Sequence, residues 1–201
     1  VLSQNYDLSC IKNEHLPIIK NYTVDFLGLN YYSRVWVKPY SGGETQLVVN
    51  NSGKDFKGES KIVIKGWFEQ IMNNPDAIYT EWDVEIYPQG LQKGLKQVWE
   101  KYHLPIFITE NGVGVREDIT VDQVEDDYRI SFMNDHISAI MNAVDAGVDV
   151  RGYYAWSTFD LYSWKNGVEK RYGLVGIDFD DKELKRKPKK SYYWYKSIAE
   201  S

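Results

Sequence analysis

A short apolar run that ends in a carboxylate constrains the fold of this chain more than any other feature. Residues 105–108 read Pro-Ile-Phe-Ile, and Thr109-Glu110-Asn111-Gly112 follow directly. A strand that is apolar on both faces indicates a parallel sheet that is covered on both sides. A carboxylate at the carboxyl end of such a strand lies where barrel enzymes place their chemistry. Because Asn-Gly is also a common turn signal, the four residues alone leave a catalytic and a structural interpretation open.

The order of the expected elements indicates an α/β protein with a parallel sheet, because its strands alternate with helices. The expected elements are, in order, the end of a helix within 1–24, strands at 24–30, 35–37, 47–49 and 62–64, a helix from Pro88, a strand at 105–108, a helix at 122–146, a strand at 150–156, an extended segment at 171–178 and a helix at 191–199. We interpret residues 33–66 as an excursion of short strands over one face, because Gly, Asn and Ser separate its β-branched runs.

Polar and aromatic residues follow each long predicted strand. They are Asn30-Tyr31-Tyr32 after the first, Glu110-Asn111-Gly112 after the second, and residues 156–163 after the third. The carboxyl ends of parallel strands share one edge of a sheet, so the three clusters should converge there. This convergence favours a functional site at that edge over an accident of sequence.

Composition and charge argue against several classes of partner. The 201 residues carry a formal net charge of -5, which argues against a general binder of nucleic acid. A single cysteine, Cys10, rules out a framework of internal disulfides. No apolar run approaches the roughly 20 residues that cross a bilayer. No signal segment is visible, so a cytoplasmic location is expected, although the start at Val1 without an initiator Met leaves room for a longer protein.

No metal or cofactor is expected. The three histidines, His15, His103 and His136, are isolated in the sequence and lack the paired spacing of metal ligands. The chain also lacks a glycine-rich loop of the kind that binds nucleotides.

Five segments occur in the same order as in a known enzyme family. They are Asp25–Tyr32, Tyr87–Leu91, Ile108–Gly112, Gly152–Ser157 and Lys170–Leu174. With these segments the chain resembles the retaining β-glycosidases of glycoside hydrolase family 1, from about residue 22 to 198. The family's fold is a (β/α)₈ barrel, so the resemblance implies that residues 1–201 are the C-terminal part of one barrel domain. About three of eight strands are visible, and a barrel usually takes about 250 residues, so the chain is expected to be incomplete on its own.

The resemblance implies a nucleophile and its immediate neighbours. Glu110 matches the family's nucleophilic glutamate, and Tyr32 matches the tyrosine that hydrogen-bonds and orients it. Asn30 matches an asparagine that lines the sugar site. A retaining glycosidase needs two carboxyl groups about 5–5.5 Å apart, one ionised to attack and one protonated to assist the leaving oxygen. The alternative for Tyr32 is a core aromatic residue at the end of a strand.

The second carboxyl group has no match in this chain. In the family the acid lies in an Asn-Glu-Pro segment of the earlier half of the barrel, and the sequence contains no such tripeptide. Asp160 and Glu85 lie near strand ends but do not match it. Asp126, Asp127 and Asp135 are interpreted as solvated helix residues without a function. We therefore expect the N-terminal half of the barrel as a partner, and we expect the chain alone to be inactive.

Residues 163–172 bear on the identity of the substrate. Plain β-glucosidases of the family carry a glutamate where this chain has Ser163, and that glutamate would repel a phosphate. Ser163, Lys170 and Tyr172 match the members that hydrolyse 6-phospho-β-glycosides, since two hydroxyl donors and one positive charge can bind a phosphate. If Lys170 is instead solvated and Tyr172 belongs to the core, a plain β-glucosidase or β-galactosidase is implied.

Three tryptophans complete the expected substrate site. Trp164 resembles the 6-phospho-β-galactosidase branch, so a phosphorylated galactoside is slightly favoured over a phosphorylated glucoside. Trp156 matches the platform for the sugar ring, and Trp82 matches a tryptophan on the aglycone side. The implied substrate is a phosphorylated disaccharide or β-glycoside. A noncatalytic, carbohydrate-binding half-barrel is the alternative from a different functional class.

Overall fold

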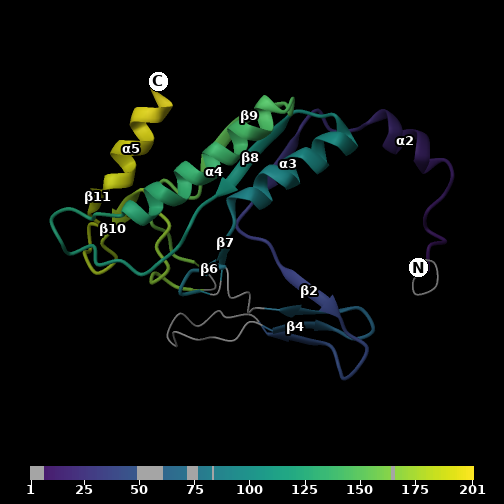
Figure 1. The fold of residues 1–201 in the computed structure, drawn as a ribbon, viewed down its shortest axis with the longest axis horizontal. Coiled ribbons are helices and arrows are strands. Elements are labelled where there is room, and N and C mark those ends of the chain that lie inside the picture. Colours follow the sequence, from purple (N-terminus) through teal and green to yellow (C-terminus); the bar gives the residue numbers. More distant parts are fainter. Residues whose placement is uncertain (1–6, 49–60, 72–76, 83, 164–165) are drawn as a thin grey trace.

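The computed structural model describes residues 7–48, 61–71, 77–82, 84–163 and 166–201 (Figure 1). The helices are α2 (His15–Asn21), α3 (Pro88–Tyr102), α4 (Asp127–Asp145) and α5 (Lys190–Ala199). The strands are β1 (Leu27–Asn30), β2 (Trp36–Pro39), β3 (Gln46–Val48), β4 (Lys61–Ile64), β5 (Phe68–Ile71), β6 (Ile78–Tyr79), β7 (Glu85–Ile86), β8 (Ile106–Asn111), β9 (Val150–Ala155), β10 (Val175–Ile177) and β11 (Arg186–Pro188). This mixture confirms the α/β class. Within the described residues, none of the helices has the length and apolar character needed to cross a bilayer.

Three parallel strands in the order β1-β8-β9 form the central sheet. β1 pairs with β8 from Leu27 opposite Ile106, and a shift after Leu29 sets Asn30 opposite Glu110. β9 lies on the other side of β8. Because the three strands run in the same direction, the polar residues at their carboxyl ends meet at one edge of the sheet, as the sequence predicts.

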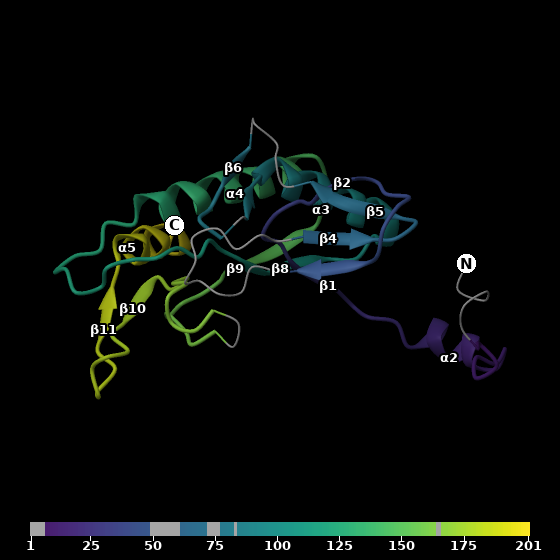
Figure 2. The same cartoon turned by 90° about the horizontal axis from the view of Figure 1, so that it is seen from below.

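Helices α3 and α4 lie side by side on one face of this sheet (Figures 1 and 2). The core between the helices and the sheet consists of buried apolar side chains, namely Leu91, Leu95, Ile106, Ile108, Ile140, Ala143 and Val148. Leu91 and Leu95 are four residues apart, so they share one stripe of α3. Pro88 suits the first turn of α3 because its φ is fixed near the helical value. His103 ends the helix in the left-handed region, with φ 50°.

The other face of the central sheet is open in the described part of the chain. Gly28, Asn30 and Thr109 are exposed on this face, and Tyr154 of β9 leaves 57% of its surface accessible. The apolar run at 105–108 predicts a strand that is covered on both sides. The parallel pairing is confirmed, but within the described residues helices cover only one face of the strand.

The excursion predicted at 33–66 is a separate antiparallel sheet with the strand order β2-β5-β4-β3. It lies apart from the central sheet, below it in Figure 1. The predicted strands at 35–37, 47–49 and 62–64 correspond to β2, β3 and β4, although residue 49 lies outside the described residues. Strand β5 is missing from the sequence-based prediction. Gly66, with φ 75°, lies in the turn between β4 and β5, which favours a residue without a Cβ.

Helix α4 begins at Asp127, later than the predicted start at 122. Residues 122–126 form a loop, in which Asp126 is completely buried. The Asp126 carboxylate accepts hydrogen bonds from the backbone N (2.8 Å) and Oγ of Ser191, at the start of α5, and from Nε of Arg129 (2.9 Å). The interpretation of Asp126 as a solvated helix charge is therefore wrong, because this carboxylate ties α4 to α5.

The same carboxylate belongs to a buried network of charges. Arg129, only 2% exposed, also binds Glu117 (2.9 Å). Lys189 is completely buried and pairs with Glu117 and with Asp160 (3.0 Å). Arg171 pairs with the second oxygen of Asp160 (2.8 Å). Three acids balance three bases, and each has a partner of opposite sign, which is the condition for burying charges at a tolerable cost.

Arg129 also joins two loops through their backbones. Its Nη1 donates to the carbonyl oxygens of Val113 (2.6 Å) and Tyr172 (2.9 Å). Val113 follows the Glu110 motif, and Tyr172 is a predicted phosphate ligand. The guanidinium therefore fixes the separation of two parts of the predicted site.

We expect Arg129→Met to lower the free energy of unfolding by about 3–5 kcal/mol, since it leaves Asp126 buried without a cation and leaves Glu117 with Lys189 alone. Urea titration followed by far-ultraviolet circular dichroism measures this loss. The control, Arg151→Met, removes an arginine that is 58% exposed beside Asp149 and should change the stability little. Equal, small losses for both variants would show that the buried network does not hold the fold.

Candidate active site

The proposed nucleophile lies at the edge where the central strands end. Glu110 is part of β8, and its backbone oxygen accepts a hydrogen bond from Tyr31 N (2.9 Å). Asn30 stands opposite Glu110 on β1, and its Oδ1 accepts a hydrogen bond from Thr109 Oγ1 (2.6 Å). The structure thus brings Asn30 and Glu110, which are 80 positions apart in the sequence, to adjacent strand ends.

Tyr32 holds one oxygen of the Glu110 carboxylate. Its hydroxyl donates to Oε2 at 2.6 Å. Burial, followed by this hydrogen bond, raises the pKa of Tyr32 well above its usual value, so the hydroxyl remains a donor. The other carboxylate oxygen, Oε1, accepts no hydrogen bond within the described residues. One oxygen is therefore oriented and the other is available to a reacting atom.

Asn111 and Gly112 fix the strand end rather than forming a simple turn. Asn111 is completely buried. Its Nδ2 donates to Tyr31 O (2.7 Å), and its Oδ1 accepts from the Tyr153 hydroxyl (2.9 Å), so one side chain bridges β1 and β9. A Cβ on Gly112 would lie 1.9 Å from the carbonyl oxygen of Trp156, so only glycine fits there. The peptide bond between Trp156 and Ser157 is cis.

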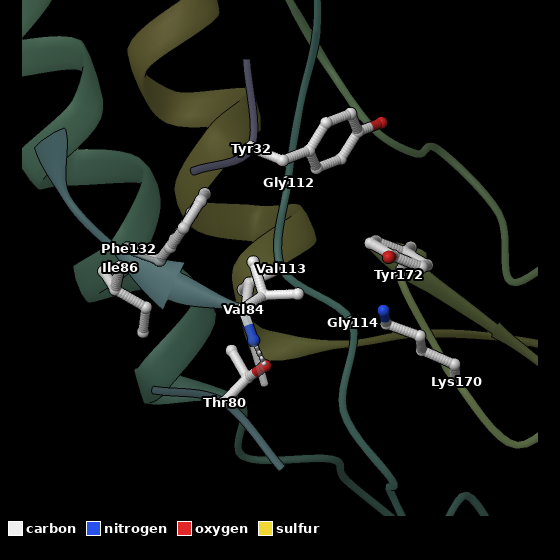
Figure 3. A pocket seen from close by; sticks show the side chains of 10 residues that line it. All are labelled: Tyr32, Thr80, Val84, Ile86, Gly112, Val113, Gly114, Phe132, Lys170 and Tyr172. Carbon is white, nitrogen blue, oxygen red and sulfur yellow. Dashed lines mark hydrogen bonds between the residues drawn. The ribbon is translucent and has the colours of Figure 1, made fainter. Parts of the chain in front are cut away.

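A pocket opens beside Tyr32, and five separate segments line it (Figure 3). They are Tyr32 itself, then Thr80, Val84 and Ile86, then Gly112, Val113 and Gly114, then Phe132 of α4, and finally Lys170 with Tyr172. Figure 3 shows Tyr172 and Lys170 together on one wall and Tyr32 above them. The pocket therefore places Tyr32, which holds Glu110, together with two of the three predicted phosphate ligands, although Glu110 itself does not line it.

Lys170 is buried in this wall without a counter-ion. It is 9% exposed, and within the described residues it forms no ion pair. Its ammonium lies 5.1 Å from the Trp82 ring centroid and 5.4 Å from that of Tyr172. Burial lowers the pKa of Lys170 from 10.5 to about 8, and the negative charge of Glu81 opposes that shift. The alternative of a solvated Lys170 is wrong.

Tyr172 connects Lys170 to the nucleophile. Its ring packs edge-on against Tyr32, with centroids 6.4 Å apart. Burial raises the pKa of Tyr172 to about 12, while the Arg129 charge opposes the shift. A Cβ on Gly114 would lie 2.6 Å from Cζ of Tyr172 and 2.8 Å from Cγ of Lys170, so glycine permits this close packing. Tyr172 is thus partly buried, yet it also lines the pocket.

The remaining predicted residues are placed less closely together. Ser163 begins the loop that leads to Lys170; its Oγ accepts a hydrogen bond from Asn166 N (3.2 Å), and it does not line the pocket of Figure 3. Trp164 lies outside the described residues. Trp156 is half-buried directly after β9, and Trp82 is 4% exposed, with an indole Nε1 that has no acceptor among the described residues.

Three charged residues beside the pocket are absent from the sequence-based prediction. Arg116 pairs with Glu81 and with Glu169, at 3.1 Å in each case, and its guanidinium lies 4.8 Å from the Trp82 ring centroid. The sequence feature that could have pointed to them is that Glu81 and Glu169 directly precede two predicted substrate ligands, Trp82 and Lys170. Charged residues next to a motif are usually solvated, so that signal is weak.

A search of the described residues for metal sites finds no group of three or more His, Cys, Asp or Glu side chains that could hold an ion. His136 is buried and stacks on Phe132, with centroids 4.0 Å apart, and its Nδ1 hydrogen-bonds Phe132 O (2.7 Å). It is therefore a core residue.

Residues 2–201 match the model of glycosyl hydrolase family 1, so the chain belongs to this family. It is 44% identical over 179 residues to a 6-phospho-beta-galactosidase of Leptotrichia buccalis, covering 88% of this chain and 37% of that protein. A 6-phospho-beta-galactosidase of Streptococcus mutans is 44% identical over 181 residues, with the same coverages. A family 1 β-glucosidase of Thermotoga maritima superposes with a TM-score of 0.70 at 31% identity, covering 89% of this chain and 35% of that one. The chain spans little more than a third of the length of these relatives.

We expect the Lys170 amine to titrate near pH 8. Because burial disfavours the ammonium, it should be charged below that pH and neutral above it, well before an ordinary lysine loses its proton. Nuclear magnetic resonance of ¹³C-labelled lysine side chains measures the midpoint, and the resonance missing from Lys170→Met assigns it. A Lys170 midpoint at the ordinary value of 10.5 would contradict the buried, unpaired amine.

Proposed function

We propose that this chain is the C-terminal part of a family 1 barrel that hydrolyses 6-phospho-β-glycosides with retention, and that Glu110 is its nucleophile. The observation that carries the proposal is the pocket. Tyr32, which is hydrogen-bonded to Glu110, lines the same space as Lys170, whose ammonium forms no ion pair within the described residues. A substrate that reaches from one to the other must present a sugar carbon to a carboxylate and an anionic group to a cation.

The reaction divides between two carboxyl groups. Oε1 of Glu110 bonds to the anomeric carbon while the bond to the leaving oxygen breaks, and that oxygen takes a proton from a general acid. In the second step the former general acid, now deprotonated, acts as a base and takes a proton from water. The oxygen of that water bonds to the anomeric carbon and displaces Glu110. In both steps Tyr32 keeps Oε2 in place through its hydrogen bond of 2.6 Å. Two displacements at one carbon preserve its configuration.

The general acid is assigned to the N-terminal half of the barrel. Of the two acids near strand ends, Asp160 pairs with Arg171 and Lys189. The guanidinium of Arg34 holds the pKa of Glu85 below its usual value. Glu85 is therefore held in the ionised form and is a poor proton donor, while each oxygen of Asp160 is already bound to a cation of this chain. We propose that this chain alone does not turn over substrate.

The shape of the central sheet supports a missing half. The face that carries Asn30, Thr109 and Tyr154 is open, and β1 and β9 each have one unpaired edge within the described sheet. Parallel sheets are covered on both faces in complete proteins, and a barrel closes such edges with further strands. Strands from the N-terminal half would cover the open face and pair with the free edges of β1 and β9.

Lys170 and Tyr172 are proposed to bind the 6-phosphate. An unpaired buried ammonium is costly, and a phosphate would give it the counter-ion that the described residues withhold. The Tyr172 hydroxyl, with its pKa raised to about 12, remains a donor at neutral pH. Ser163 and Trp164, which lie a few residues before Lys170 in the sequence, are proposed to complete this end. The curated relatives named 6-phospho-beta-galactosidase support the galactoside over the glucoside.

Three further residues are proposed to bind the rest of the substrate. Asn30 and Trp156, both at the strand-end edge near Glu110, would contact the sugar ring, with the indole face of Trp156 as its platform. Trp82 would lie on the aglycone side. Its buried indole N–H lacks an acceptor among the described residues, and a substrate oxygen could supply one.

A plain β-glucosidase is the second candidate function. It is favoured by the solved structures that superpose on this chain, whose names are family 1 β-glucosidases. The two functions differ in whether Lys170 contributes to substrate preference.

The catalytic proposal is tested with activated nitrophenyl glycosides. The full-length enzyme should turn them over, and Glu110→Gln should abolish formation of the glycosyl-enzyme while it preserves the fold, because an amide is nearly isosteric but a very poor nucleophile. This chain alone should show no turnover, because no general acid is assigned to it. Near-normal activity of Glu110→Gln would overturn the nucleophile, and turnover by the isolated chain would overturn the division of the site.

The phosphate proposal is tested by the ratio of kcat/KM for 6-phosphorylated and plain glycosides. Lys170→Ala should lower this ratio by about one to two decades, since a charge-assisted bond to an ion contributes roughly 1.5–3 kcal/mol. Ser163→Glu should act in the same direction by placing a like charge near the phosphate. Lys96→Ala, which removes a lysine that is 64% exposed on α3, is the control. An unchanged ratio in both test variants would make the plain β-glycosidase the better description.

A further inference from the structure

Arg116 links three loops around the pocket. Its backbone N–H and its Nη1 both bind the Glu81 carboxylate, in the loop that follows β6. Its Nη2 binds Glu169 (3.1 Å), in the loop that carries Lys170. Arg116 itself follows Val115, whose backbone pairs with Arg171. One guanidinium thus binds two carboxylates, one adjacent in sequence to Trp82 and the other adjacent in sequence to Lys170.

These two carboxylates are the natural competitors of a phosphate for Lys170. Glu169 precedes Lys170 in the chain, and the charge of Glu81 acts on the Lys170 amine. Nevertheless, neither forms an ion pair with Lys170, because each is already bound to Arg116. Arg116 and Lys170 also share the Trp82 ring, at 4.8 and 5.1 Å from its centroid. Both cations therefore contact the same indole, while the two acids form ion pairs with Arg116 and not with Lys170.

We propose that Arg116 is a positioning residue that sets the preference for a phosphorylated substrate. By holding Glu81 and Glu169, it keeps the Lys170 ammonium unpaired and neutralises the acids that would repel an incoming phosphate. The inference rests on the proposed function, because it assumes that Lys170 meets the substrate's phosphate. Arg116 acts through Lys170 and is assigned no contact with the reacting atoms.

The expected effect is moderate because the cluster is partly solvated. The side chains of Arg116, Glu81 and Glu169 are 26%, 24% and 43% exposed. Water and salt screen charges at such positions, so the influence of Arg116 should weaken as ionic strength rises. A purely structural role for Arg116 would show neither this salt dependence nor a difference between phosphorylated and plain substrates.

The test compares kcat/KM for a 6-phosphorylated glycoside and its plain counterpart in the full-length enzyme. Arg116→Gln should lower the ratio by about tenfold at low salt, mainly through KM for the phosphorylated substrate. Adding Glu81→Gln and Glu169→Gln to that variant should restore the ratio to within about twofold, because the freed carboxylates are then absent. Lys190→Gln is the matched control: it also releases two carboxylates, Glu125 and Asp127, but outside the pocket, so the ratio should not change.

The outcomes separate this inference from the proposed function. If Lys170→Ala leaves the ratio unchanged, the phosphate site itself is wrong. Three results would overturn only the role of Arg116, provided that Lys170→Ala lowers the ratio. Arg116→Gln could leave the ratio unchanged, it could lower both kcat/KM values equally, or Glu81→Gln and Glu169→Gln could fail to restore its ratio. Should Arg116→Gln fail to fold, Arg116→Lys replaces it. A single ammonium can hold one carboxylate, so the ratio should fall by about threefold and recover when Glu169→Gln is added. An unchanged ratio in Arg116→Lys would then overturn the inference.

Discussion

The buried guanidinium of Arg129 is the interaction on which the candidate site depends. A cation that is almost fully removed from water needs several acceptors, and Arg129 finds them in two carboxylates and in backbone oxygens of two loops. Those loops carry Gly112–Gly114 on one side and Lys170–Tyr172 on the other. The cost of leaving this charge unsatisfied therefore holds the loop after the nucleophile against the loop of the proposed phosphate ligands.

Two buried lysines illustrate how the same group serves structure and binding. Lys189 is completely buried and pairs with Glu117 and Asp160, so its charge is compensated within the protein. Lys170 is 9% exposed, and in the described structure its ammonium lies over the rings of Trp82 and Tyr172 and forms no ion pair. The first arrangement stabilises the ends of α4 and α5. The second leaves a charge uncompensated at a pocket, which is a feature expected of a site that binds an anion.

The open face of the central sheet explains why this chain can orient the proposed nucleophile, Glu110, although no general acid is assigned to it. Asn111, bonded to both neighbouring strands, makes the strand-end edge rigid without any contribution from the open face. The helices α3 and α4 complete the core on their side. Glu110 can therefore be oriented by residues of this chain, while whatever lies across the open face must be contributed from elsewhere.

The sequence by itself determined the class of the fold and the order of the main strands and helices, and its resemblance to the family implied the pairing of Glu110 with Tyr32. Apolar runs and the order of motifs can be read directly from the sequence, because neither depends on which distant segments pack together. The burial of Asp126, the single-sided cover of the strand at 105–108 and the isolation of Lys170 were decided by the tertiary structure alone. Each depends on which distant segments pack together, since a charge next to a motif looks the same in the sequence whether water, a partner or a pocket surrounds it.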